Sequence, residues 1–160
     1  MTQPQIKNIF FVVISSLLFF LEIMLFALLQ RYEIYPLFCF FIALLVQSPQ
    51  KRTLVMPLFL MSLLSYLEIN IFGWCLVYII PTILLANYLD QHLRIKIIIP
   101  YCLLIFALCL KMILMWNMDG ITISWIHAAQ IIIYNIIILK MFIIVGAYLE
   151  KRFEGIVLQK

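Results

Sequence analysis

The chain has 160 residues, of which 67% are hydrophobic and 11% are charged, and its formal net charge is +4. Soluble domains average about 45–50% apolar and about 25% charged residues, so this chain has too few polar side chains to cover a water-exposed surface. The composition therefore excludes an ordinary soluble protein and indicates one domain, residues 1–160, that lies mostly in a lipid bilayer. In such a chain, basic residues set the orientation in the membrane, and we expect no nucleic-acid binding.

Apolar segments follow one another along the whole chain, and they predict an all-α, polytopic membrane protein. A span needs about 20 mainly apolar residues, each adding about 1.5 Å. Pro36, Pro57 and Pro100 fall near the starts of predicted helices, where a missing N–H group is tolerated. The second and third spans are short. The six predicted spans are residues 9–29, 32–46, 53–67, 71–89, 97–116 and 123–149.

Basic residues are distributed unevenly over the predicted loops. With the N-terminus inside, eight of them face the inner side and one, Arg31, faces the outer side. The positive-inside rule expects this asymmetry, so we predict six spans with both termini cytoplasmic. Five spans would move the C-terminal basic residues outside and remove the asymmetry. The eight inner residues are Lys7, Lys51, Arg52, Arg94, Lys96, Lys151, Arg152 and Lys160.

Aromatic side chains with a polar edge lie near the predicted outer ends of the spans. Rings of this kind settle at the level of the lipid headgroups, so we expect them at the membrane surface. The set comprises Tyr32, Tyr35, Trp74, Trp116 and Trp125.

Three ionisable residues fall inside predicted spans, where a charge costs about 2.5 kcal/mol or more. Glu22 stands seven residues, about 10 Å, from the outer end of its span, and Lys111 stands five residues, about 8 Å, from its own. These depths match, so a Glu22–Lys111 pair is geometrically possible. Alternatively, Lys111 extends its long stem to the headgroups, or these charges line a proton or substrate path, or they meet a partner helix. Lys140 lies about 13 Å from the inner end, with no carboxylate at its level.

Catalytic and metal-binding patterns are missing from the sequence. There is no G-x-S-x-G elbow, H-E-x-x-H helix, glycine-rich phosphate loop or CxxC pair. The cysteines lie in apolar runs and are read as small apolar side chains. We therefore expect no enzyme activity, no cofactor and no metal.

The most informative stretch is a predicted helical hairpin with a tight turn at residues 68–73. It follows a short proline-led helix and the loop P-Q-K-R, and it reads MPLFLMSLLSYLEINIFGWCLVYIIPTILLANYLD. This order resembles MreD, the small six-helix membrane subunit of the bacterial rod-shape machinery. Phe72 and Gly73 match the family's L-G pair. Ser65 stands where the family has an acidic residue, Glu68 is the nearest acid, and the family's third-helix glycines are replaced.

The resemblance implies a non-enzymatic scaffold in the bacterial plasma membrane. Its partners would be an MreC-like membrane protein and the cell-wall synthases of the elongation complex. We expect the hairpin to contact the partner through Ser65, Glu68 and Gly73. Because the family's fold is similar to that of the substrate-binding subunits of energy-coupling-factor transporters, a small-molecule transport subunit is the alternative. An intramembrane enzyme is a third and weaker hypothesis.

A transport subunit should enclose a pocket that is lined by polar side chains and open to the outside. The outer half offers few such groups, namely Glu22, Lys111, Asn117 and Asp119. A scaffold should instead present an exposed apolar face to a partner.

Overall fold

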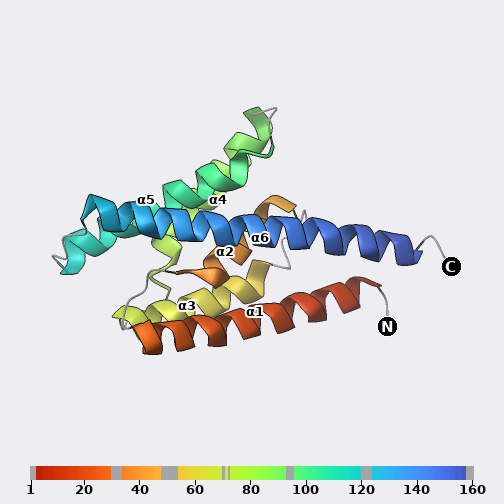
Figure 1. Ribbon diagram of the computed structural model, residues 1–160, viewed down its shortest axis with the longest axis horizontal. Helices are drawn as coiled ribbons and strands as arrows, with labels where there is room; N and C mark the ends of the chain where they lie inside the picture. The colour runs from red at the N-terminus through yellow and green to blue at the C-terminus, as the bar shows by residue number, and fades with distance from the viewer. Residues whose placement is uncertain are drawn as a thin grey trace.

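The structure is a computed structural model that describes residues 3–29, 34–47, 54–69, 71, 73–92, 96–119 and 124–157. Within these ranges the chain is all-α and has six helices and no strand. The helices are α1 (Gln3–Leu29), α2 (Pro36–Gln47), α3 (Val55–Ile69), α4 (Leu76–His92), α5 (Ile99–Asp119) and α6 (Trp125–Val157). Figure 1 shows α1 and α6 running along the long axis in opposite directions, so that the start of α1 and the end of α6 lie at the same end of the molecule.

Each predicted span corresponds to one helix, and the prolines lie where the sequence predicted them. Pro36 is the first residue of α2, Pro57 the third of α3 and Pro100 the second of α5. At these positions the missing N–H would have had no partner within the helix, so proline starts a helix without loss. The predicted all-α class with six helices is confirmed for the described residues.

The predicted starts of the second and fourth helices, at residues 32 and 71, are too early, since α2 begins at Pro36 and α4 at Leu76. The sequence predicted a helix from Ile71, but residues 73–75 form a turn and the helix begins at Leu76. Gly73 has a φ of 79°, a left-handed conformation that glycine adopts without strain, and the N–H of Leu76 donates to its carbonyl at 2.9 Å. The backbone conformation of this turn therefore requires glycine at position 73.

Helix α2 is the centre of the molecule. Each of its residues from Pro36 to Leu44 is buried, and Leu37, Phe41 and Ile42 have no exposed surface. It packs against α1, α3, α4, α5 and α6. A helix of 12 residues is about 18 Å long, so α2 on its own is shorter than the hydrocarbon core of a bilayer.

Side-chain contacts at its two ends show that α2 runs parallel to α6. Near the start, the N–H of Tyr35 donates to Oδ1 of Asn135 at 2.9 Å. At the other end, Nε2 of Gln47 donates to the carbonyl of Ile143 at 3.1 Å. Gly146 lies against the Gln47 amide, and a Cβ atom at that position would collide with it. The absent side chain therefore leaves room for the Gln47 amide against α6.

Large apolar side chains are exposed along whole helix faces. On α1 they recur at Val13, Leu17, Phe20 and Met24, which are 50–64% exposed. Among the described residues one segment, Trp125–Tyr148 of α6, is long and apolar enough to cross a membrane, and 17% of it is buried. The shorter apolar segments are Ile9–Leu25, Pro36–Gln47, Val55–Leu67 and Ile99–Met115. The finer claim of six crossings stays a prediction.

Candidate functional site

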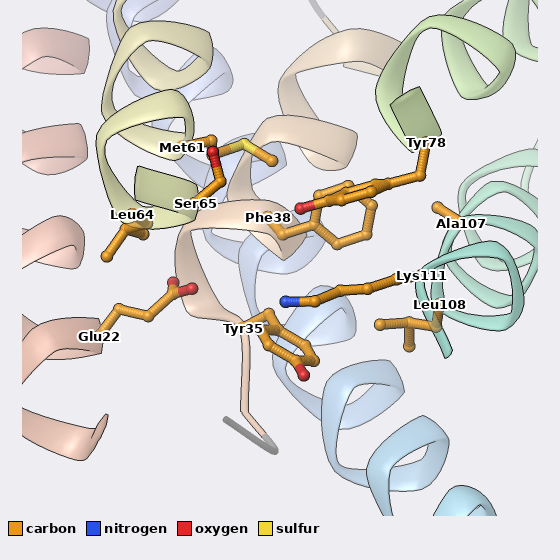
Figure 2. A pocket seen from close by; sticks show the side chains of 10 residues that line it. All are labelled: Glu22, Tyr35, Phe38, Met61, Leu64, Ser65, Tyr78, Ala107, Leu108 and Lys111. Carbon is orange, nitrogen blue, oxygen red and sulfur yellow. The ribbon is translucent and has the colours of Figure 1, made fainter. Parts of the chain in front are cut away.

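A small cavity lies inside the bundle, beside the start of α2. Side chains of α1 to α5 line it, and Figure 2 shows Glu22 of α1 and Lys111 of α5 pointing toward one another. The centre of a water-sized molecule can occupy about 20 Å³ of this cavity, which is room for about one or two water molecules. The cavity is lined by Glu22, Tyr35, Phe38, Met61, Leu64, Ser65, Tyr78, Ala107, Leu108 and Lys111.

The buried start of α2 explains why polar groups gather here. The first N–H groups of any helix have no acceptor within the helix, and away from water they must find one elsewhere. The first helical bond of α2 runs from the N–H of Cys39 to the carbonyl of Tyr35, so Tyr35 is the N-cap residue. Pro36, the next residue, has no N–H to satisfy. The remaining donors at this end require acceptors from other helices.

Two side chains from distant parts of the chain supply acceptors for two of these donors. Oε2 of Glu22 accepts from the N–H of Leu37 at 2.9 Å, and Oδ1 of Asn135 accepts from the N–H of Tyr35 at 2.9 Å. Nδ2 of Asn135 in turn donates to the carbonyl of Ile131 at 2.8 Å, which fixes the orientation of the amide. A carboxylate at a helix N-terminus is also favoured by the helix dipole. The caps therefore tie α1 and α6 to the start of α2.

Lys111 brings a positive charge to the same place. Its side chain is 8% exposed, and its Nζ lies 4.0 Å from the centroid of the Tyr35 ring. A cation over the face of an aromatic ring is stabilised by the ring's quadrupole, and more so where water is excluded. The ammonium thus lies inside the bundle, whereas a lysine that extends to the lipid headgroups would have its ammonium at the outer surface. Glu22, at 5% exposed, faces it across the cavity.

The three hairpin residues that were predicted to contact a partner lie in different environments. Ser65 is buried beside the cavity, and its single O–H lies within donating distance of two carbonyl oxygens, that of Ser62 at 2.9 Å and that of Ile71 at 3.4 Å. Gly73 is partly exposed in the turn before α4. Glu68 is in the last turn of α3, and its side chain lies outside the described residues. Ser65 therefore holds the hairpin together from inside, and its hydroxyl is not on the outer surface.

Lys140 is not part of this site. It is exposed on α6, whereas Asn135, five residues earlier on the same helix, is fully buried. The structure thus brings together Glu22, Lys111 and Ser65 among the predicted residues and separates Lys140 from them.

Two residues of the site were missed by the sequence. No role was predicted for Asn135, and Tyr35 was predicted to lie at the headgroups, whereas Tyr35 is 6% exposed within the bundle. One feature of the sequence could have indicated both residues: Tyr35–Pro36 begins an apolar helix that is too short to cross a bilayer. Such a helix begins inside the bundle, so its first N–H groups need acceptors from other helices.

The chemistry available at this site is that of structural hydrogen bonding and charge. Within the described residues no group of three or more His, Cys, Asp or Glu side chains could hold a metal ion. Comparison with protein-family models, with curated proteins and with solved structures finds no match for this chain.

We predict that Glu22 and Lys111 are energetically coupled. Glu22→Gln keeps an oxygen for the N–H of Leu37 but removes the charge, and Lys111→Met removes the opposite charge. Each single change strands a buried charge, which costs about 3–5 kcal/mol, so each should lower the thermal midpoint in detergent by several degrees. The double variant should recover much of the loss.

The matched control for this cycle is Lys96→Met, which removes an exposed lysine before α5 and should leave the midpoint almost unchanged. Additive effects of Glu22→Gln and Lys111→Met in the double variant would show that the two charges do not interact.

Proposed function

We propose that this chain is a six-span protein of the bacterial plasma membrane that acts as an MreD-like, non-enzymatic scaffold. In this proposal it binds an MreC-like membrane protein and, through it, the cell-wall synthases of the elongation complex. One observation carries the proposal: apolar side chains cover the outer faces of the helices, while the ionisable Glu22 and Lys111 are buried at the centre.

The outer faces support the membrane part of the proposal. Soluble monomers rarely expose contiguous apolar patches larger than a few hundred Å². Here α1, α4 and α6 all expose rows of large apolar residues, with Leu17, Leu84 and Ile144 between 59% and 64% exposed. The apolar segment of α6 is 17% buried, which differs from the core helix of a soluble protein. Lipid is the solvent that would suit such a surface.

The helix directions support the proposed topology. In a chain with six consecutive crossings, the second and sixth helices run the same way and the two termini share one side. The contacts Tyr35–Asn135 and Gln47–Ile143 make α2 and α6 parallel. The start of α1 and the end of α6 also lie at one end of the molecule (Figure 1).

The cavity favours a scaffold over a transport subunit. A binding site for a metabolite typically has a volume of about 300–1,000 Å³, and several of its polar groups point at the ligand. The cavity beside α2 has room for about one or two water molecules. Its charged side chains already meet the needs of the fold, since Glu22 caps α2 and Lys111 lies over Tyr35.

The α3–α4 hairpin offers a surface for the partner. Tyr66, Leu67 and Ile71 are 44–52% exposed at the end of α3 and the start of the turn. We call these three residues and Gly73 the hairpin tip, an apolar end of the hairpin where the glycine permits close approach of another backbone. Ser65, which the family resemblance also implicates, would act by holding this tip in shape.

The proposed topology predicts the sides on which loop reporters appear. Fusions of a compartment-sensitive reporter after Gln47, Asn70, Gln91 and Gly120 should read inside, outside, inside and outside in turn. The basis is the eight-to-one distribution of basic residues. An external signal after Gln91 would contradict the proposal.

The proposed scaffold role predicts that the hairpin tip is needed for partner binding. Tyr66→Ala combined with Leu67→Ser removes exposed apolar surface at the tip, so retention of an MreC-like protein in mild detergent should fall at least about fivefold. The matched control is Leu84→Ser, which removes a side chain of similar exposure on α4 away from the tip. If the tip variant retains the partner as well as the control does, the hairpin is not the contact surface.

A further inference from the structure

Lys140 occupies an unusual position for a lysine. It lies on α6 within Trp125–Tyr148, the segment that is long and apolar enough to cross a membrane. It is eight residues from the end of that segment, about 12 Å along the axis. A lysine stem has four carbons and covers only part of that distance.

The surroundings of Lys140 form an exposed apolar face. At helical spacing its neighbours are Ile133, Ile137 and Ile144, which are 53–59% exposed. We call these four residues the Lys140 face. The opposite side of α6, which carries Asn135 and Leu139, packs against the bundle and is fully buried. Figure 1 shows α6 extending along the whole length of the molecule, so this face is long enough to receive another helix.

The described part of this chain supplies no counter-charge to Lys140. Lys140 forms no ion pair with a described residue, unlike Lys96, whose Nζ lies 3.3 Å from Oδ1 of Asp90 at the end of α4. Glu22 faces into the cavity beside Lys111 (Figure 2). The nearest acidic residue of α6, Glu150, follows ten residues later, about 15 Å along the helix.

We infer that the Lys140 face binds a transmembrane helix of a different protein that carries a carboxylate at the depth of Lys140. A charge in lipid is costly and is normally paired with an opposite charge, so the partner's Asp or Glu would remove the cost of both. The isoleucines at i−7, i−3 and i+4 would pack along the same partner helix. This inference rests on the proposed membrane location.

Charge excludes a second copy of this chain as the occupant. All copies have the same orientation in the membrane, and a twofold dimer through one face brings identical residues together. A dimer through the Lys140 face would therefore place two lysines side by side, which is unfavourable in lipid. The occupant is thus a heterologous helix with an acidic residue, and it meets a surface separate from the hairpin tip.

Association with designed single-span helices tests this inference. The chain, labelled with a fluorophore, is reconstituted in phosphatidylcholine vesicles with an alanine–leucine helix that carries one Asp at the depth of Lys140. Energy transfer measures the association. We expect the Asp helix to bind at least about tenfold more tightly than a helix with Leu at that position, and Lys140→Met to abolish the difference.

Charge reversal provides the sharpest control. The Lys140→Asp variant should no longer bind the Asp helix more tightly than the Leu helix, and it should bind a helix that carries Lys at the same position. Equal binding of the Asp and Leu helices, or binding unchanged by Lys140→Met, would overturn the inference. The inference would also be overturned if the Asp and Leu helices bound equally in vesicles that contain phosphatidylglycerol, because Lys140 would then bind anionic headgroups instead.

A separate readout distinguishes failure of this inference from failure of the proposed membrane location. Resistance of the reconstituted chain to alkaline extraction reports membrane insertion. A chain that resists extraction but shows no charge-dependent association overturns only the role of Lys140. A chain that is extracted overturns the membrane location and the inference together.

Discussion

The buried start of α2 is the constraint on which the rest of the structure depends. A helix that begins inside a bundle has N–H groups that bulk water cannot reach. Three of the first four positions are provided for, since Pro36 has no N–H, Glu22 accepts from Leu37 and Asn135 accepts from Tyr35. An uncapped donor at this depth would cost about 1–3 kcal/mol, so these contacts select one arrangement of α1, α2 and α6 over others.

The same constraint explains the charge distribution at the centre. Once Glu22 is inside to cap α2, its negative charge needs compensation, which the positive end of the helix dipole provides. Lys111, stacked on the ring of the N-cap residue Tyr35, places a second positive group at the same cavity. In the proposed membrane location a polar cluster of this kind would specify how apolar helices pack, because lipid and Leu are equally apolar and burial alone cannot choose among packings.

Sequence reasoning could predict the helices better than their faces. Prolines and polar loops marked where helices start and end, and the apolar segments were long enough to recognise. It could not predict which side of each helix faces inward, because apolar residues surround helices such as α4 on all sides. The matched depths of Glu22 and Lys111 were visible in the sequence, but the burial of Tyr35 and the capping by Asn135 depend on helix rotation. The start of α4 was predicted too early because the turn at Gly73 lies within an apolar stretch of sequence, which looks like part of the helix.

Amide hydrogen exchange in detergent micelles, measured residue by residue, tests the central claim most directly. If Asn135 and Glu22 cap α2, the N–H groups of Tyr35 and Leu37 should exchange as slowly as those in the middle of the helix. Asn135→Leu should then speed exchange at Tyr35 by at least about tenfold, whereas Asn87→Leu, on the exposed side of α4, should not. Rapid exchange at Tyr35 and Leu37 in the unmodified chain would contradict the account.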